Sequence, residues 1–210
     1  MSVAAIDIGS NSVRLLVVGP DGSEIARDTA VTALGTGLEE TGSFDAAAYD
    51  ATLAVIRRYA STIAGLDVQD VRAVATSASR DAHNGAALMA DISRVLGIEP
   101  SIIDGAREAS LAFAGATRAG GRTGPTLVID VGGGSTEFVY GVDAPSYAVS
   151  IDMGSVRLTD RCFDRRPATE GQVSHARSEA DAAFAPVDVC GRPETAIGVA
   201  GTFTSLSAMA

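Results

Sequence analysis

The sequence predicts an α/β fold made of two domains that repeat one plan, each a mixed sheet flanked by helices. The first observation is a polar turn after an apolar strand, which occurs as Ile6–Ser12 and, in altered form, as Ile129–Glu137. The second is that apolar runs typical of strands alternate with segments whose apolar residues recur at helical spacing. The third is a glycine-rich polar stretch, residues 118–125, which we interpret as the linker between the domains.

The first domain is expected to span residues 1–122 and to open with three strands joined by tight turns. A glycine-rich loop at 34–42 precedes a helix for which Ser43 offers an N-cap. In chain order the expected elements are strands at 3–8, 13–18 and 24–33, a helix at 45–64, a strand at 71–76, a helix at 86–96 ended by Gly97, a strand at 101–104 and a helix at 107–117.

The second domain, residues 123–210, repeats the order of strand, polar turn and strand. Further strands are expected at 147–151 and 195–199, and helices at 156–163 and 169–185. An apolar helix begins after Gly201 and Thr202, and the sequence stops at Ala210 without a polar ending. We therefore expect the second domain to be incomplete.

The composition is that of a globular protein, with 46% apolar and 20% charged residues. The formal net charge of −10 argues against nucleic-acid partners, which require a basic surface. No apolar run is long enough to cross a membrane, and no basic segment leads into an apolar core at the N-terminus, so we expect a cytoplasmic protein without a membrane partner. Cys162 and Cys190 lack the spacing of a metal site and are expected to be ordinary thiols.

Both polar turns carry residue types that bind phosphate. Glycine lets backbone N–H groups approach an anion closely, and serine adds a hydroxyl donor. The expected phosphate-binding residues are Gly9, Ser10, Asn11 and Ser12 in the first turn and Gly132, Gly133, Gly134 and Ser135 in the second.

Three carboxylates at the strand ends are candidate metal ligands. Asp7, Asp130 and Glu137 could hold Mg²⁺ or Mn²⁺, directly or through water. The two aspartates could instead accept hydrogen bonds within their own turns. Because an aspartate occurs at the same place in both turns, metal binding is favoured over hydrogen bonding within the turn.

Six motifs follow one another along the sequence: Asp7–Ser12, Ala75–Ala82, Asp104–Ala109, Asp130–Glu137, Met153–Thr159 and Gly198–Thr202. Each motif alone is a weak signal, and their order and spacing make the set specific. Together they make the chain similar to the exopolyphosphatase/guanosine pentaphosphate phosphatase family, within the actin-like ATPase-domain superfamily. The resemblance runs from Ala4 to the end of the sequence.

The resemblance implies two ribonuclease-H-like domains and a phosphoanhydride hydrolase. Its substrate would be inorganic polyphosphate, expected to be short, or guanosine pentaphosphate, a nucleotide of the stringent response. The resemblance also implies Mg²⁺ or Mn²⁺ as a cofactor and leaves a homodimer open. Glu108 matches the family's proposed base and is expected to activate water in an interdomain cleft. The other interpretation of Glu108 is a solvated glutamate favoured by the helix dipole.

Four further positions bear on substrate binding. Arg80 is expected in a serine-rich turn after a buried strand, where it could reach a phosphate as a forked donor or pair with Asp81 at the surface. Gly201 and Thr202 match a segment of the superfamily that lies near the nucleoside or distal phosphates. Ala33 stands where many family members have an arginine, so one basic contact to a long substrate is expected to be missing.

Two other functions are weighed against the hydrolase. An ATP-dependent small-molecule kinase of the same superfamily would need a catalytic aspartate for an acceptor hydroxyl, and we find no such motif. A non-catalytic regulator that binds polyphosphate or an alarmone would need no carboxylate to activate water. Because Glu108, Asp130 and Glu137 are all present, the sequence favours the hydrolase.

Overall fold

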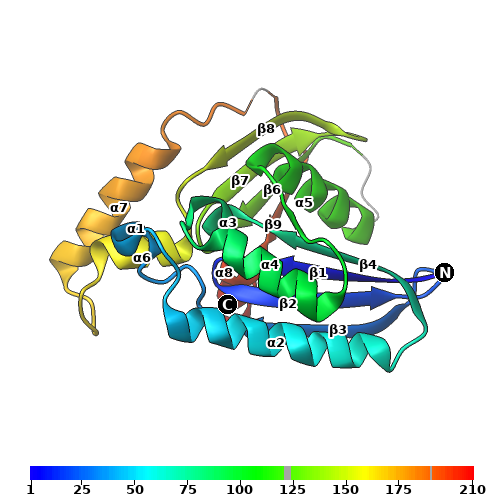
Figure 1. The fold of residues 1–210 in the computed structure, drawn as a ribbon. Coiled ribbons are helices and arrows are strands. Elements are labelled where there is room, and N and C mark those ends of the chain that lie inside the picture. The colour runs from blue at the N-terminus through cyan, green and yellow to red at the C-terminus, as the bar shows by residue number, and fades with distance from the viewer. Residues whose placement is uncertain (121–123, 190) are drawn as a thin grey trace. The chain divides into compact units, whose positions relative to one another are not determined.

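The computed structural model describes residues 1–120, 124–189 and 191–210, which form two compact units, Met1–Ile103 and Asp104–Ala210. Each unit contains one mixed sheet with helices packed on it, which is the α/β plan predicted from the sequence (Figure 1). The predicted domain boundary between residues 122 and 123 lies outside the described residues. The division into units falls earlier in the chain, before helix α5 (Gly105–Gly120).

The sheet of the first unit has the strand order β3-β2-β1-β4-β5. β1, β2 and β3 form an antiparallel meander, and β4 and β5 continue the sheet in parallel with β1. Alternate residues of β1 and β2 are buried, as expected for strands packed on one face. The bounds are β1 Ser2–Ile8, β2 Ser12–Val18, β3 Glu24–Val31, β4 Val68–Ala75 and β5 Ser101–Ile102.

The helices of this unit confirm most of the sequence prediction and correct it in three places. The helices are α1 (Leu38–Thr41), α2 (Ala46–Ala64), α3 (Ser77–Asp81) and α4 (Gly85–Leu96). Asp45, rather than Ser43, caps α2, because its carboxylate accepts hydrogen bonds from the N–H groups of Ala47 and Ala48. The glycine-rich loop contains α1, and the segment expected to be a serine-rich turn around Arg80 is α3. Gly97 ends α4 in the left-handed conformation, as predicted.

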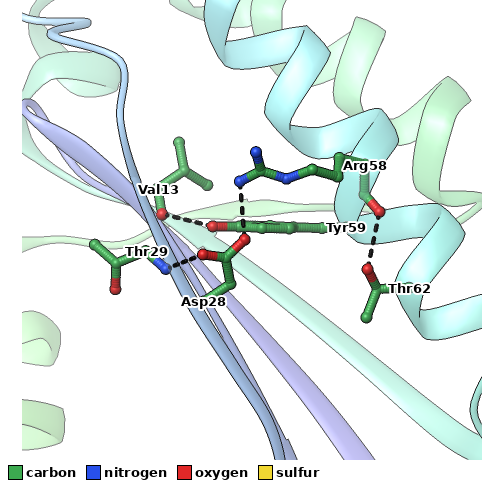
Figure 2. Close-up of polar contacts among 6 residues, drawn as sticks. All are labelled: Val13, Asp28, Thr29, Arg58, Tyr59 and Thr62. Atoms are coloured by element: carbon green, nitrogen blue, oxygen red, sulfur yellow. Dashed lines mark hydrogen bonds and ion pairs between the residues drawn. The ribbon is translucent and has the colours of Figure 1, made fainter.

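A buried hydrogen bond sets the position of α2 on the sheet (Figure 2). The Tyr59 side chain is fully buried, and its hydroxyl donates to the backbone oxygen of Val13 at 3.1 Å. The neighbouring Arg58 forms an exposed ion pair with Asp28 of β3 at 2.8 Å. Because an exposed pair contributes little, the buried Tyr59 bond and the surrounding apolar packing hold α2 in register with β2.

The sheet of the second unit has the order β8-β7-β6-β9, with β9 parallel to β6 and the other pairs antiparallel. The bounds are β6 Thr126–Val131, β7 Thr136–Gly141, β8 Pro145–Ile151 and β9 Thr195–Val199. α5 lies across this sheet (Figure 1). Its Ala109 and Phe113 are buried against Val128 and Val139, and this apolar packing joins α5 to the second unit.

The remaining helices are α6 (Ser155–Cys162), α7 (Glu170–Phe184) and α8 (Ala200–Met209), close to the predicted ranges. Thr169 and Gln172 form a capping box at the start of α7. Cys162 is buried at the end of α6, whereas Cys190 lies outside the described residues. Within the part of the chain that the structure describes, no helix has the length and apolar content needed to cross a bilayer.

Candidate phosphate and metal site

The two polar turns are the ends of hairpins with the same register. Asp7 lies opposite Arg14 in the first hairpin, and Asp130 lies opposite Glu137 in the second. In each turn the first glycine donates its N–H to the serine that closes the turn, at 3.0 Å. A Cβ on either glycine would lie 3.2 Å from that serine's carbonyl oxygen, a tighter approach than most residues tolerate. The motif recurrence in the sequence therefore corresponds to a recurrence of backbone geometry.

The backbone of residues 32–35 supports the first turn by donating hydrogen bonds to its carbonyl groups. The carbonyl of Ser10 accepts a hydrogen bond from Gly35 N–H at 2.7 Å, and the carbonyl of Asn11 accepts from Thr32 and Ala33 N–H at 3.0 Å. Gly35 is close to Ser10, since an added Cβ would meet Ser10 Cβ at 3.1 Å. Ala33, expected only as a missing basic contact, thus supports the turn through its backbone and does so at a left-handed φ of 52°.

These bonds determine which way the turn's N–H groups face. In a planar trans peptide, the carbonyl of one residue and the N–H of the next point in opposite directions. With the carbonyls of Ser10 and Asn11 directed at residues 32–35, the N–H groups of Asn11 and Ser12 point to the opposite side. Successive N–H groups presented in this way are typical of anion-binding turns.

The second turn is held in the same manner by the start of α6. The carbonyl of Gly132 accepts from Ser155 N–H at 2.9 Å, and the carbonyl of Gly133 accepts from Val156 N–H at 2.8 Å. By the same peptide geometry, the N–H groups of Gly133 and Gly134 point away from α6. The second turn therefore also presents its N–H groups on one face, as the sequence predicted from its glycines and serine.

A pair of carboxylates flanks the second turn. Asp130 and Glu137 are direct cross-strand partners in an antiparallel pair, a position where two like charges repel. Glu137 is only 1% exposed, and its Oε1 accepts a hydrogen bond from Ser150 Oγ at 2.6 Å. Mg²⁺ typically takes one or two carboxylates and completes its shell with water and phosphate oxygens. The donor set of this pair thus fits Mg²⁺, which would also relieve the repulsion.

Asp7 differs from its counterpart Asp130 because its cross-strand partner is a cation. The Arg14 guanidinium lies 3.7 Å from the Asp7 carboxylate. Burial raises the pKa of the Asp7 carboxyl above its usual range although 42% of the side chain is exposed, and Arg14 opposes this rise. Among the described residues, no three His, Cys, Asp or Glu side chains gather as a metal cluster. A metal role for Asp7 therefore stays a prediction. The cross-strand neighbour of Asp7 is the cation Arg14, whereas that of Asp130 is the carboxylate Glu137.

Glu108 lies on the first turn of α5, as the sequence predicted. The start of this helix is close to the carboxylate pair, because a Cβ on Gly105 would lie 2.6 Å from Ser150 Cβ. Asp104 caps the helix by accepting from Arg107 N–H at 2.7 Å. Ser150 of β8 also donates a hydrogen bond to Glu137 of β7. The start of α5, which carries Glu108, therefore lies beside these two strands.

The other predicted residues are divided between the two units. In the first unit, Ser10 Oγ lies 3.1 Å from Ser77 Oγ, so the first turn contacts the start of α3, which carries Arg80. Arg80 donates to the carbonyl oxygen of Ile103. In the second unit, Thr202 Oγ1 donates to the carbonyl of Val131 at 3.2 Å, which brings Gly201 and Thr202 to the second turn.

Three residues of this arrangement were given no role from the sequence. Arg14 could have been found by matching the hairpins, since it stands at the position of Glu137. Arg157 belongs to the quoted motif Met153–Thr159, and its Nε donates to the carbonyl of Gly134 at 2.9 Å. Ser150 carries no local signal, because its contact with Glu137 depends on strand pairing.

Two mixed sheets flanked by helices, each with a strand–turn–strand hairpin of one geometry, place the chain in the actin-like ATPase fold class, and comparison with known proteins specifies the family. The model of the Ppx/GppA phosphatase family matches residues 18–210. Exopolyphosphatase 2 of Mycobacterium tuberculosis is 38% identical over 227 residues, covering 99% of this chain and 70% of the relative. A guanosine-5'-triphosphate,3'-diphosphate pyrophosphatase of Vibrio atlanticus is 30% identical, covering 97% of this chain and 42% of the relative.

Solved structures agree with this assignment. An exopolyphosphatase from Cytophaga hutchinsonii has a TM-score of 0.91 at 29% identity, covering all of this chain and 70% of that chain. A PPX-GPPA enzyme of Aquifex aeolicus has a TM-score of 0.79 at 34% identity and is covered to 71%. The chain belongs to the Ppx/GppA phosphatase family, and it is shorter than these relatives.

Proposed function

We propose that this protein is a metal-dependent phosphohydrolase that releases terminal orthophosphate from inorganic polyphosphate, with a preference for short chains, from guanosine pentaphosphate, or from both. The observation that carries the proposal is the second turn, where oriented N–H groups stand beside the carboxylate pair Asp130 and Glu137. Family membership supports it, since relatives named for each of these two substrates match the chain.

The chemistry needs a bound phosphoryl group, neutralised charge and an activated water. Backbone N–H groups of both turns would bind phosphate oxygens, and Asp130 with Glu137 would hold Mg²⁺ or Mn²⁺. Such a metal ion neutralises charge on the phosphates when bound. Glu108, on the helix that packs beside Glu137's strand, would accept the proton of the attacking water.

A phosphate-release assay tests this function. The chain is incubated with short polyphosphate, guanosine pentaphosphate and ATP side by side, each with Mg²⁺ and with a chelator. We expect release from one or both of the first two substrates, loss of activity with chelator, and little release from ATP. Release unaffected by chelator would refute the metal role, and a chain that binds polyphosphate without releasing phosphate would be a binding protein instead.

A further inference from the structure

Three consecutive carbonyls of the second turn accept hydrogen bonds from the start of α6. The Gly132 carbonyl accepts from the N–H of Ser155, and the Gly133 carbonyl accepts from the N–H groups of Val156 and Arg157. The Gly134 carbonyl accepts from a side chain, through the Nε of Arg157. The first two acceptors are held by neutral donors, namely backbone N–H groups and, at Gly132, also the Ser155 hydroxyl at 3.2 Å. Gly134 is held by a charged guanidinium at 2.9 Å, and charge-assisted hydrogen bonds are the stronger kind.

The bond from Arg157 acts on the peptide that joins Gly134 to Ser135. Because this peptide is planar, a carbonyl directed at Arg157 turns the N–H of Ser135 to the opposite face. A positive charge on the carbonyl side also polarises the peptide and strengthens the N–H as a donor. Arg157 therefore bears on both the direction and the strength of the last N–H group in the turn.

The first turn has a different support. Its carbonyls, Ser10 and Asn11, accept from the backbone N–H groups of Thr32, Ala33 and Gly35. The charged support thus occurs at the turn that also carries Asp130 and Glu137. In the transition state of phosphoryl transfer, negative charge is spread over the equatorial oxygens of the transferred group and develops on the leaving oxygen, so a strengthened donor is most useful at that turn.

We propose that Arg157 is a positioning residue that orients the Ser135 N–H toward the phosphoryl group undergoing transfer. The proposal rests on the proposed function above. It assigns to Arg157 an effect on turnover rather than on general substrate affinity, because a donor placed for the geometry and charge of the transition state contributes mainly there.

The test compares substitutions at two arginines of the same helix. Arg157→Ala removes the bond to Gly134, and Arg157→Lys keeps the charge without the planar guanidinium. Arg161→Ala is the matched control, because Arg161 lies one turn further along α6 and pairs with Glu179 at 3.9 Å. Each variant is assayed for phosphate release from short polyphosphate, with thermal unfolding measured on the same samples.

We expect Arg157→Ala to lower kcat by about 10–100-fold, below the roughly 10²–10³-fold loss typical when a direct donor to an oxyanion is removed. KM should change much less, Arg157→Lys should lie between the parent and Arg157→Ala, and added methylguanidine should restore part of the activity. Arg161→Ala should behave as the parent does. Equal activities for the alanine variants at 157 and 161 overturn the proposal, and so does a loss that appears only in KM.

A measurement without substrate separates this inference from the proposed function. The carbonyl ¹³C resonance of Gly134 reports the bond from Arg157 directly. It should shift in Arg157→Ala and stay in place in Arg161→Ala. If the parent releases no phosphate, the proposed function fails while this resonance still decides whether Arg157 holds the turn; an unmoved resonance overturns the positioning role.

Discussion

Replacing Gly154 by alanine tests how closely α6 supports the second turn. An added Cβ would lie 2.5 Å from the carbonyl carbon and oxygen of Gly133 and 2.7 Å from the nitrogen of Gly134. Ordinary contact begins near 3.4 Å, so α6 or the turn must move by 3.4 − 2.5 = 0.9 Å. The backbone of Gly154 is extended, with φ −136° and ψ 176°, so alanine meets a steric conflict and no strain in φ.

A displacement of this size has a predictable cost. Overpacking of this kind destabilises a fold by about 1–3 kcal/mol. A misplacement of about 1 Å at groups that hold a substrate can cost roughly 10²-fold in rate, which is about 2.7 kcal/mol of transition-state stabilisation. We therefore expect Gly154→Ala to remain folded and to lose about 100-fold in kcat/KM for short polyphosphate.

The control is Gly115→Ala, in the same unit. Nothing lies within 4 Å of a Cβ built on Gly115, which is an exposed position of α5. Alanine should therefore leave activity unchanged and raise stability by about 0.5–1 kcal/mol through its helix propensity. Phosphate release gives the rates, and thermal unfolding followed by circular dichroism gives the stabilities. A Gly154→Ala variant within threefold of the parent in kcat/KM would refute the idea that the position of this turn limits catalysis.

Four further predictions follow from the site and the core. Glu108→Gln should retain substrate binding while turnover falls by about 10²–10⁴-fold, the usual range for a lost general base, and near-normal turnover would remove Glu108 from the reaction. Asp130→Asn should alter the Mg²⁺ dependence of activity more than the free energy of unfolding, whereas an unchanged Mg²⁺ titration would leave Asp130 as a turn residue only. Short polyphosphates should be hydrolysed at least as efficiently per chain end as long ones, because the chain carries a net charge of −10 that salt screens; kcat/KM against chain length at two ionic strengths measures this, and a steep rise with length at low salt contradicts it. Burial raises the pKa of the Cys162 thiol, so alkylation of a folded Cys190→Ser variant should accelerate only at a pH above the usual cysteine range, and rapid reaction at neutral pH would show an exposed thiol.

The sequence alone determined the features that depend on neighbouring residues. Apolar runs identified the strands, and apolar residues at helical spacing identified most helices. Gly97 marked the end of α4 because a residue tolerant of positive φ ends a helix in that way. The recurrence of the two turns likewise predicted two hairpins of one geometry, since the spacing from Asp7 to Ser12 and its counterpart sets the turn. Glu108 was correctly placed at a helix start for the same local reason.

Tertiary structure decided which distant groups meet. Apolar packing of Phe113 against Val128 and Val139 joined α5 to the second sheet. Strand register placed Arg14 opposite Asp7 but Glu137 opposite Asp130, which makes the two hairpins chemically different. The support of each turn comes from a segment that follows the third strand of its own meander. A carbonyl accepts whichever donor packing brings to it, and that choice depends on contacts between segments far apart in the chain.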